Sequence, residues 1–445
     1  MFYGTTGMLF LPSILSACKK TTLQNENNFS GEVIIIGAGI SGLYAAKILN
    51  EFGIKSTILE ASDRVGGRIK TLSGYADFDI ELGADEIIGE NSMWHDMVLA
   101  GGASFVSNSG SPLYYFNGSI KNEIEASQNT FFNAMNNIIA SIGDYAGSDV
   151  TAEVFANLSG VSDNVFHIFN AKVANAVGSC DERMGMFGLR TVEERRTSGT
   201  TKKFIKNKGL KSILDQQFSK EIGNVILNSR IQSIDYSGAK VTVTDEVGNV
   251  YSADKVIITV PIGVLQNNDI TFTPELPVSH SYAIQQIGFD QGMKIIVQFD
   301  ERVWPTNTGV IYGSGLIPEF RTTAALERST EDRWLTAIVN GANAETLSAQ
   351  GDGMIDVVLG EIDQVLGEVS MHYVDHVIQN WGSDPLFRGV MSYSKPGTGN
   401  SRTVLTQPIG HKIYFAGEAV HDGGHHGTVH GAMESALRSV IDIIS

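Results

Sequence analysis

Gly37, Gly39 and Gly42 form the pattern Gly-x-Gly-x-x-Gly, which suits the binding of a diphosphate. The first glycine allows a tight turn, the second lets the backbone approach the phosphates, and the third lets a helix pack closely on a strand. Glu60 follows about 20 residues later, where a carboxylate accepts hydrogen bonds from ribose hydroxyls. The spacing therefore predicts a dinucleotide site with its phosphates at the N-terminus of a helix.

The elements around this glycine loop fit the same interpretation. Residues 32–36 (EVIII) are a nearly continuous apolar run, typical of a central parallel strand. Residues 43–50 favour a helix, and residues 56–59 predict a second short strand that ends at Glu60. A glycine-rich turn without a ligand is the alternative. The order of strand, glycines, helix, strand and acid favours the binding site.

A second glycine loop selects the dinucleotide. Glu60 is followed by ASDRVGGRIKT, which contains Arg64, Gly67 and Arg68. A nicotinamide dinucleotide requires no such loop, whereas the longer pyrophosphate and ribityl chain of a flavin needs a second loop that carries a cation. Both arginines could instead be surface charges. In this context the loop indicates FAD.

The string ILEASDRVGGR resembles the flavin-dependent amine oxidases, a family that includes monoamine oxidase, polyamine oxidase and the lysine-specific histone demethylases. The resemblance extends from about residue 31 to residue 445 and suggests a bacterial member. It implies an α/β fold, in which a Rossmann-like FAD-binding domain of the GR2 type carries an inserted α+β substrate-binding domain. The expected boundaries are 31–90, 204–277 and 390–445 for the FAD-binding domain, and 91–203 and 278–389 for the substrate-binding domain.

The resemblance also implies which residues contact the flavin, because the chain is expected to return to it at residues 81–86, 225–261 and 413–436. No cysteine occurs in residues 389–399, where some relatives attach FAD covalently, so the FAD is expected to be non-covalent. The expected FAD-binding residues are Gly37, Gly39, Ile40, Ser41, Gly42, Glu60, Ala61, Arg64, Gly67, Arg68, Gly83, Ala84, Asp85, Glu86, Ile231, Thr259, Val260, Pro261, Trp381, Gly417, Glu418, Thr428, Val429 and Ala432.

Two residues are expected to act in catalysis. Lys294, in GFDQGMKIIVQFD, matches the family lysine that holds a water against the flavin, where an ammonium stabilises negative charge. Trp381, in NWGSDPLFRG, matches the tryptophan beside the flavin. The alternatives are a lysine at a surface edge and an ordinary core tryptophan.

The activity that the resemblance implies is oxidation of a primary or secondary amine, including a polyamine. The amine becomes an imine, water hydrolyses it to an aldehyde, and dioxygen is reduced to hydrogen peroxide. An L-amino-acid oxidase is an alternative, with Arg190, Arg195 or Arg196 as loose candidates for holding a carboxylate. A flavin-binding protein with little oxidase activity is another.

The substrate positions depart from the family pattern. Two aromatic rings usually flank the amine, but these positions fall on Met391 and Thr428, so the cage is expected to be absent or rebuilt with Tyr393. Ile88 stands where several bacterial relatives have histidine. Glu86 and Glu90 are possible anchors for a distal ammonium, although either could be a solvated rim residue.

A histidine-rich segment invites a metal interpretation, which we do not favour. His426 and His430 are spaced to share a helix face, and His421, Asp422 and His425 lie nearby. The segment is expected to cross the flavin, where histidines line the pocket, so no metal is predicted. No Gly-x-Ser-x-Gly elbow supports a serine hydrolase.

The N-terminal residues indicate export. Residues 8–17 (MLFLPSILSA) are an apolar run too short to span a bilayer, and residues 15–18 resemble a lipobox whose Cys18 becomes lipidated. Residues 1–18 would form the signal and residues 19–30 a tether, which predicts a periplasmic or membrane-anchored lipoprotein. A frayed apolar tail on a cytoplasmic protein is the alternative. A membrane contact is expected only through this anchor.

Composition limits the remaining classes. The chain has 445 residues, enough for two or more domains, and a net charge of −17, which argues against nucleic acid and suits a cationic solute. Cys18 and Cys180 cannot form a disulfide framework. The expected partners are therefore a small amine and dioxygen, while the oligomeric state is left open. One helical stripe is predicted to face the core: Phe131, Phe132, Met135, Ile138, Ile139 and Ile142.

Overall fold

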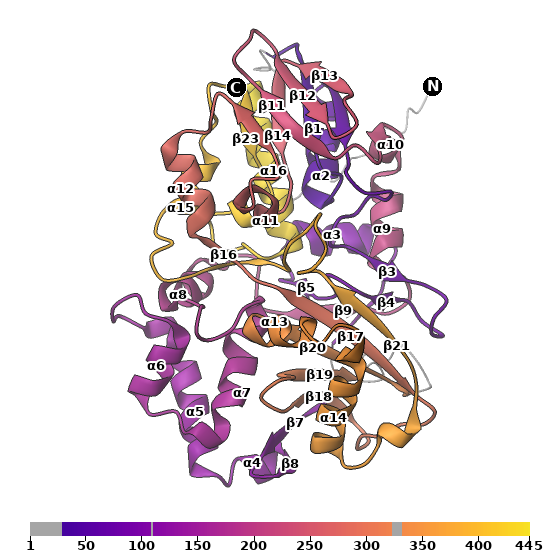
Figure 1. Cartoon of the computed structure of the whole chain (residues 1–445), viewed down its shortest axis with the longest axis vertical. Coiled ribbons are helices and arrows are strands. Elements are labelled where there is room, and N and C mark those ends of the chain that lie inside the picture. Colours follow the sequence, from indigo (N-terminus) through magenta and orange to yellow (C-terminus); the bar gives the residue numbers. More distant parts are fainter. Residues whose placement is uncertain (1–28, 108–109, 323–331) are drawn as a thin grey trace, which may run out of the picture.

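The computed structural model describes residues 29–107, 110–322 and 332–445. Two sheets organise it, one in the upper half of Figure 1 and one in the lower half. The predicted signal, lipobox and most of the tether, with Cys18, lie outside the described residues. In the part of the chain that is described, no helix has the length and apolar character needed to cross a membrane.

The upper sheet is parallel and has the strand order β10-β2-β1-β14-β23. Its central strand β1 places Val33 and Ile35 in one core and Ile34 and Ile36 in another, because successive side chains point to opposite faces. The strands are β1 (Glu32–Ile36), β2 (Lys55–Leu59), β10 (Val225–Ile226), β14 (Lys255–Ile258) and β23 (Ile413–Phe415).

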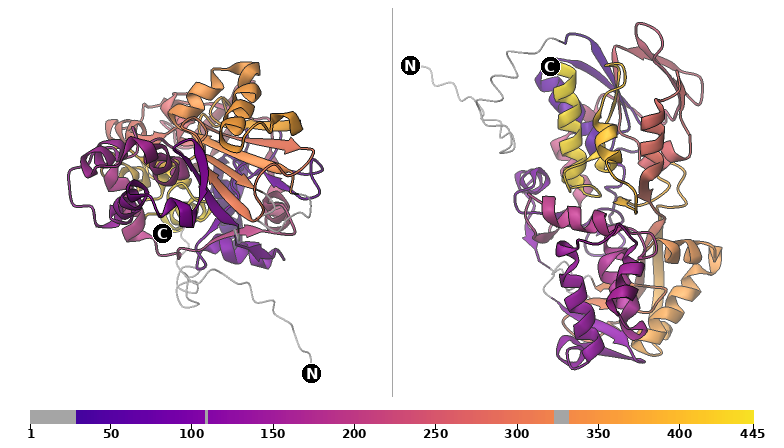
Figure 2. Two further views of the ribbon diagram at one scale, coloured as in Figure 1. Left: turned by 90° about the horizontal axis from the view of Figure 1, so that it is seen from below. Right: turned by 90° about the vertical axis from the view of Figure 1, so that its left-hand side faces the viewer.

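Helices cover one face of this sheet, and a smaller sheet covers the other. On the first face, α2 (Ile40–Glu51) packs beside α16 (Val429–Ile444) (Figure 2). This contact brings the beginning and the end of the described chain together. On the second face lies the four-stranded sheet β13-β12-β11-β15. Its strands are β11 (Ile231–Asp235), β12 (Val241–Asp245), β13 (Val250–Ala253) and β15 (Thr271–Thr273).

The lower sheet has seven strands in the order β21-β17-β20-β19-β18-β7-β8. It combines residues from two distant parts of the chain, because β7 pairs in parallel with β18. The strands are β7 (Ser111–Phe116), β8 (Ser119–Asn122), β17 (Gly292–Phe299), β18 (Thr308–Tyr312), β19 (Glu319–Thr322), β20 (Trp334–Asn340) and β21 (Tyr373–Asn380).

Two groups of helices flank the lower sheet (Figures 1 and 2). The first group, α13 (Ala342–Ser348) and α14 (Met354–Leu366), shares a core with β17 and β20. The second group shares a core with β7: α4 (Glu123–Ala126), α5 (Thr130–Ala140), α6 (Ala152–Ser159), α7 (Asp163–Val173) and α8 (Met186–Arg195).

The remaining elements connect these layers. Four of the remaining strands have two residues, namely β3 (Thr71–Leu72), β4 (Ile80–Glu81), β5 (Ile87–Ile88) and β6 (Phe105–Val106), and the others are β9 (Lys202–Ile205), β16 (Ile287–Phe289) and β22 (Ser392–Ser394). The helices are α3 (Met93–Ala100), α9 (Leu210–Gln217), α10 (Ser219–Ile222), α11 (Ile262–Gln266), α12 (Val278–Gln286) and α15 (Ser401–Thr406).

The α/β fold class and the strand at residues 32–36 are confirmed. Packing continues the upper unit beyond the predicted boundary at residue 90, since Trp94 and Val98 of α3 lie in the same core as α2. The stripe on α5 is only partly correct. Phe132 and Met135 are fully buried, but Phe131 is 51% exposed, because it lies on the solvent face of the helix.

Candidate active site

A cavity of about 790 Å³ contains most of the predicted site residues. Three of the predicted residues, Gly42, Arg64 and Glu90, are not among those that line it. The predicted residues that do are Gly37, Gly39, Ile40, Ser41, Glu60, Ala61, Gly67, Arg68, Gly83, Ala84, Asp85, Glu86, Ile88, Ile231, Thr259, Val260, Pro261, Lys294, Trp381, Met391, Tyr393, Gly417, Glu418, Thr428, Val429 and Ala432.

The first glycine loop lies between β1 and α2 and leaves room for a ligand. A Cβ on Gly42 would lie 2.0 Å from the Gly37 carbonyl oxygen, so this position requires glycine for packing. A Cβ on Gly39 would meet no protein atom within 4 Å and would occupy space beside the cavity. The buried Ser41 hydroxyl, in the first turn of α2, has no hydrogen-bond partner among the described residues.

Glu60 fixes this loop from the end of β2. Its Oε2 accepts a hydrogen bond from Ala38 N at 2.6 Å, and its Oε1 accepts hydrogen bonds from the backbone and hydroxyl of Ser62. A carboxylate has about four acceptor positions, so the residue can still accept from a ligand. Glu60 is 8% exposed and lines the cavity.

The two arginines of the second glycine loop contact different parts of the chain. Gly66 N donates to the Ala38 carbonyl at 2.9 Å, which holds this loop against the first one. Arg64 turns back onto its own loop and donates to the Gly67 carbonyl at 2.7 Å. Arg64 does not line the cavity and its guanidinium shapes the loop, so its contact with the cofactor stays a prediction.

Arg68 reaches across to the C-terminal part of the chain. Its Nη1 lies 2.9 Å from Oε1 of Glu418 and also donates to the Val390 carbonyl. Oε2 of Glu418 accepts from Ser392 N and Oγ and from Gly427 N. Burial alone would raise the pKa of Glu418, but the Arg68 charge and these hydrogen bonds keep that pKa below its usual value.

Lys294 projects from β17 toward the segment that follows β4. Its Nζ lies 2.7 Å from Oδ2 of Asp85 and donates to the carbonyls of Gly83 at 2.8 Å and Glu81 at 3.3 Å. Trp381 packs against the same segment, since its Nε1 donates to the Leu82 carbonyl at 2.9 Å. The two predicted catalytic residues thus hold one stretch of backbone from the lower sheet.

A charge network surrounds Asp85 and Glu86. Arg321 of β19 contacts Asp85 at 3.2 Å, Glu86 at 3.1 Å and Glu319 at 2.7 Å, and Lys202 contacts Glu86 at 3.0 Å. Arg321 could not be predicted from the sequence, because no motif surrounds it and Asp85 and Glu86 are distant in the chain. The positive charges of Arg321 and Lys202 offset the negative charge of Glu86, so Glu86 would attract a substrate ammonium less strongly.

The far end of the cavity is mainly apolar. One face of α8 and the residue after it contribute Leu189, Val192, Glu193 and Arg196, at the spacing i, i+3, i+4, i+7 that lies on one side of a helix. Apolar side chains complete this wall: Ile88, Ile139, Ile142, Val173, Val177, Met184 and Met391.

Three of the predicted substrate residues have other contacts. Glu90 accepts hydrogen bonds from Thr201 N and Oγ1 and lies outside the cavity lining. Tyr393 is 3% exposed, and a Cβ on Gly288 would lie 2.4 Å from its ring, so the ring is packed in the core. Thr428 caps α16, because its hydroxyl accepts from Gly431 N.

Comparison with known proteins identifies the family. The family described as "Flavin containing amine oxidoreductase" matches residues 40–101 and 165–444, which is more than half of the chain. The chain belongs to this family. Its cofactor is FAD, and its reaction is oxidation of an amine.

Similar proteins within the curated set include two kinds of amine oxidoreductase. Polyamine oxidase 4 of Oryza sativa subsp. japonica is 28% identical over 95% of this chain and 89% of its own length. Lysine-specific histone demethylase 2 of Homo sapiens is 25% identical over 95% of this chain. The chain spans 54% of that demethylase, about half of its length.

Solved structures share the fold of this amine oxidoreductase. Putrescine oxidase bound to putrescine superposes with a TM-score of 0.78 at 20% identity and covers 94% of this chain and 99% of its own. Cyclohexylamine oxidase from Brevibacterium oxydans gives a TM-score of 0.78 at 19% identity over 94% of this chain and 99% of its own.

The residues of this amine oxidoreductase fit FAD. The open space at Gly39 and the unpartnered Ser41 hydroxyl suit a diphosphate at the N-terminus of α2. Glu60 suits a ribose, and Arg68 and Glu418 meet where the second loop reaches the C-terminal segment. Thr428 and Val429 bring the N-terminus of α16 to the cavity, where its dipole favours negative charge.

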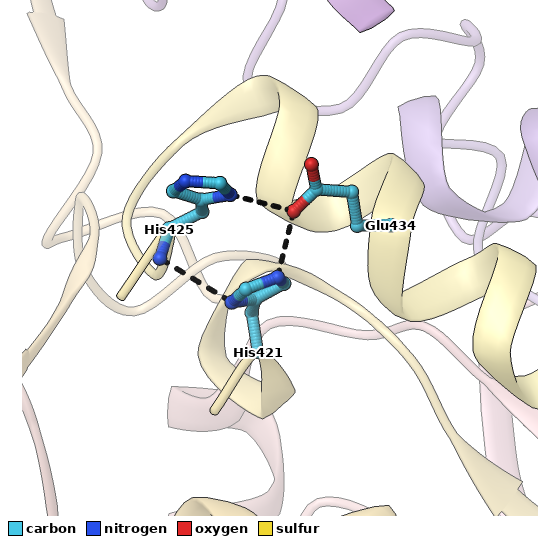
Figure 3. A group of neighbouring side chains, drawn as sticks. All are labelled: His421, His425 and Glu434. Atoms are coloured by element: carbon cyan, nitrogen blue, oxygen red, sulfur yellow. Dashed lines mark hydrogen bonds and ion pairs between the residues drawn. The ribbon is translucent and has the colours of Figure 1, made fainter. Parts of the chain in front are cut away.

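The histidine-rich segment forms a compact cluster in this oxidoreductase (Figure 3). Nε2 of His421 and Nδ1 of His425 each lie 2.7 Å from Oε2 of Glu434. Burial would raise the pKa of Glu434, but the hydrogen bonds from the two histidines lower that pKa to about 2. The histidines stand out in the sequence, but no motif there links Glu434 to them.

The hydrogen bonds of this cluster favour protons over a metal ion. The ligand atoms lie within 4.8 Å of one another, a spacing that could suit a metal. However, Gly423 N and His425 N donate to Nδ1 of His421, and Thr197 N donates to Nε2 of His425. Those nitrogens must accept, so the protons of both rings lie on the side of Glu434. A metal there would have to displace both protons.

Proposed function

We propose that this chain oxidises a primary or secondary amine whose remaining part is mainly apolar. The observation that supports this best is the set of apolar side chains in the cavity lining, to which Leu189 and Val192 of α8 contribute. Asp85 and Glu86, two acids of the cavity wall, are already paired with cations. An apolar substituent would therefore be favoured over a second ammonium.

Two cations of the cavity lining also favour a neutral substituent over a second ammonium. Lys172 lines the cavity beside Tyr114 and Tyr312, with its Nζ within 6 Å of both ring centres, and burial lowers its pKa. Arg196 also lines the cavity, as does the carboxylate residue Glu193 of α8. A polycation would meet repulsion from both, whereas a neutral apolar substituent would not.

The reaction balances without a protein base if the amine binds as the neutral form. The amine loses two electrons and two protons from its α-carbon and nitrogen; bound FAD would supply the electron acceptor, and dioxygen would take up the electrons and protons as hydrogen peroxide. Water then hydrolyses the imine to an aldehyde and ammonia or a smaller amine. The tasks of this chain are to orient the amine, exclude water and stabilise the charge of the reduced cofactor.

A polyamine is the second candidate. The similarity to polyamine oxidase 4 supports it, and Glu193 has no ion pair among the described residues. Glu193 is exposed at the rim, so it could hold a distal ammonium where an entering substrate passes. This candidate requires that the attraction of a distal ammonium by Glu193 exceed its repulsion by Lys172 and Arg196.

An amine that carries a carboxylate is a third candidate. Of the three arginines considered, Arg190 pairs with Glu194, and Arg195 donates to the Asp422 carbonyl. Arg196 alone lines the cavity and has no hydrogen bond to the described residues. It is therefore the residue that an L-amino acid would use.

Peroxide release on a panel of amines separates these candidates. Hexylamine and benzylamine should give a higher kcat/KM than putrescine, spermidine or L-leucine. Higher values for the polyamines, reduced in Glu193→Gln but unchanged in the control Glu90→Gln, would establish the second candidate and overturn the first. A value for L-leucine that falls in Arg196→Gln would establish the third. Retained FAD without peroxide from any amine would leave a flavin-binding protein.

We also propose that the chain is exported and anchored by a lipid on Cys18, as a bacterial lipoprotein. The support is the apolar run at residues 8–17 and the lipobox-like residues 15–18. Expression in Escherichia coli tests this: the wild type should appear in the membrane fraction and Cys18→Ser should not. Equal amounts of both proteins in the soluble fraction would overturn the proposal.

A further inference from the structure

The ammonium group of Lys294 has no free hydrogen-bond donor in this structure. An ammonium carries three N–H donors. Three acceptors surround Nζ: Oδ2 of Asp85 at 2.7 Å and the carbonyl oxygens of Gly83 at 2.8 Å and Glu81 at 3.3 Å. The side chain is only 12% exposed, so the arrangement is held within the protein.

Asp85 is the one charged acceptor among these three, and it is shared. The same oxygen lies 3.2 Å from Nη1 of Arg321, whose side chain is 15% exposed. Arg321 has two further carboxylate partners, Glu86 and Glu319, whereas the carboxylate that contacts Lys294 is Asp85. Removing the charge of Asp85 would therefore affect Lys294 directly and Arg321 less.

We propose that Asp85 is a positioning residue that limits the positive charge which Lys294 presents to the flavin. An ammonium paired with a carboxylate at 2.7 Å acts on more distant groups as a dipole, and the field of a dipole falls off faster than that of a single charge. Asp85 also directs the N–H bonds of Lys294 toward the protein. Both effects make the bound flavin a weaker electrophile than it would be beside an unpaired lysine.

This inference rests on the proposed flavin chemistry and concerns how strongly the cofactor attracts electrons. The cavity contains Lys294, Asp85 and Trp381 together, so a change in charge at Asp85 takes place at the wall of the site. Asparagine has nearly the same shape as aspartate and can still accept from Lys294, but it lacks the negative charge. Asp85→Asn therefore isolates the effect of charge.

Sulfite provides a readout that is independent of turnover, because it adds to electrophilic flavins and bleaches their visible absorption. In the holoenzyme, Asp85→Asn should bind sulfite at least fivefold more tightly than the wild type. Glu319→Gln is the matched control, since it removes one negative charge from the same network without contacting Lys294. Its sulfite affinity should stay within twofold of that of the wild type.

The lysine itself supplies the second half of the test. If Asp85 acts through Lys294, the tighter sulfite binding of Asp85→Asn should disappear when Lys294→Met is also present. Asp85→Ala removes the same charge but changes the shape of the side chain, and it should also bind sulfite more tightly than the wild type. This variant keeps the test possible if Asp85→Asn folds poorly.

The outcomes are distinct. Unchanged or weaker sulfite binding in both Asp85 variants, with FAD retained, would overturn the inference and leave the proposed function intact. An equal effect in Glu319→Gln would show that total charge matters rather than the contact with Lys294, which also overturns it. Wild-type protein that binds no FAD at all would instead overturn the proposed function.

Discussion

Nη1 of Arg68 lies 2.9 Å from Oε1 of Glu418, although 350 positions separate the two residues. The contact joins the second glycine loop to the segment that leads into α16. Glu418 is 7% exposed in its side chain and also accepts from Ser392 and Gly427. One carboxylate therefore fixes three segments around the cavity.

Glu418→Gln should reduce both FAD content and stability. Arg68 would lose its charged partner in a largely buried position, and removal of one member of a buried pair typically destabilises by about 3 kcal/mol. The measurements are the ratio of flavin to protein absorption and urea unfolding. Glu32→Gln is the control, because its pair with Lys55 is exposed and should leave both quantities unchanged. Full FAD content in Glu418→Gln would contradict this role.

Two glycine variants should separate folding from cofactor binding. Gly42→Ala places a Cβ 2.0 Å from the Gly37 carbonyl oxygen, so the apoprotein itself should be destabilised by several kcal/mol. Gly39→Ala meets no protein atom within 4 Å, so its apoprotein should unfold at the temperature of the wild type while FAD affinity falls at least tenfold. Thermal unfolding with and without FAD tests both. If Gly39→Ala binds FAD with the affinity of the wild type, the phosphates of FAD do not bind at this loop.

The FAD should be released intact by acid. Among the described residues the free cysteine is Cys180, which is buried and does not line the cavity, so no thiol is placed to attach the flavin. Precipitation with trichloroacetic acid should leave the yellow colour in the supernatant. Flavin that stays in the pellet after digestion would show a covalent bond through another residue.

Lys294→Met should retain FAD and reduce the rate of flavin reoxidation by dioxygen. The variant removes an ammonium from the cavity wall and leaves Asp85 with Arg321 as its cation. A lost charge-stabilising donor raises a barrier by roughly 3–4 kcal/mol, and because Asp85 offsets part of the charge we expect about 2 kcal/mol, or roughly thirtyfold. Stopped-flow reoxidation measures this, with Lys172→Met as the control. An unchanged rate constant would exclude Lys294 from the oxidative step.

Asp181→Asn should stabilise the protein at neutral pH. Burial raises the pKa of Asp181 from 3.8 to about 6. Because the folded state binds this proton more tightly than the unfolded state, stability is highest below about pH 3.8 and declines as the pH rises toward 6. Asparagine removes this loss, so we expect a gain of about 1–2 kcal/mol at pH 7.

The pH dependence supplies the control for that prediction. The gain from Asp181→Asn should shrink between pH 6 and pH 4, as measured by urea unfolding at each pH. Glu182→Gln, at the exposed neighbouring position, should show a much smaller change over this range. A gain that does not vary with pH would mean that packing, and not the charge of Asp181, is responsible.

Features whose parts are close in the sequence could be predicted well. The strand at residues 32–36, the glycines and Glu60 form one continuous unit, so their spacing alone indicates a diphosphate site. Residues farther along the chain, such as Lys294 and Thr428, were placed at the cavity by family resemblance and not by local pattern.

Features that depend on distant pairing could not be predicted. Asp85 meets Lys294 only because β17 packs against the segment after β4, and Arg321 joins them from β19. Glu90 resembles Glu86 in the sequence, yet Glu86 precedes β5 and contacts Lys202 and Arg321, whereas Glu90 follows β5 and accepts from Thr201 outside the cavity lining. The direction of a side chain after a two-residue strand is set by tertiary contacts.

The position of α16 determines when the flavin site can exist during synthesis. The glycine loop at residues 37–42 is translated long before Glu418 and the first turn of α16, which the cavity also requires. The parallel sheet is likewise incomplete until β23 adds to β14. A growing chain therefore carries only part of the flavin site until the first turn of α16 has been synthesised.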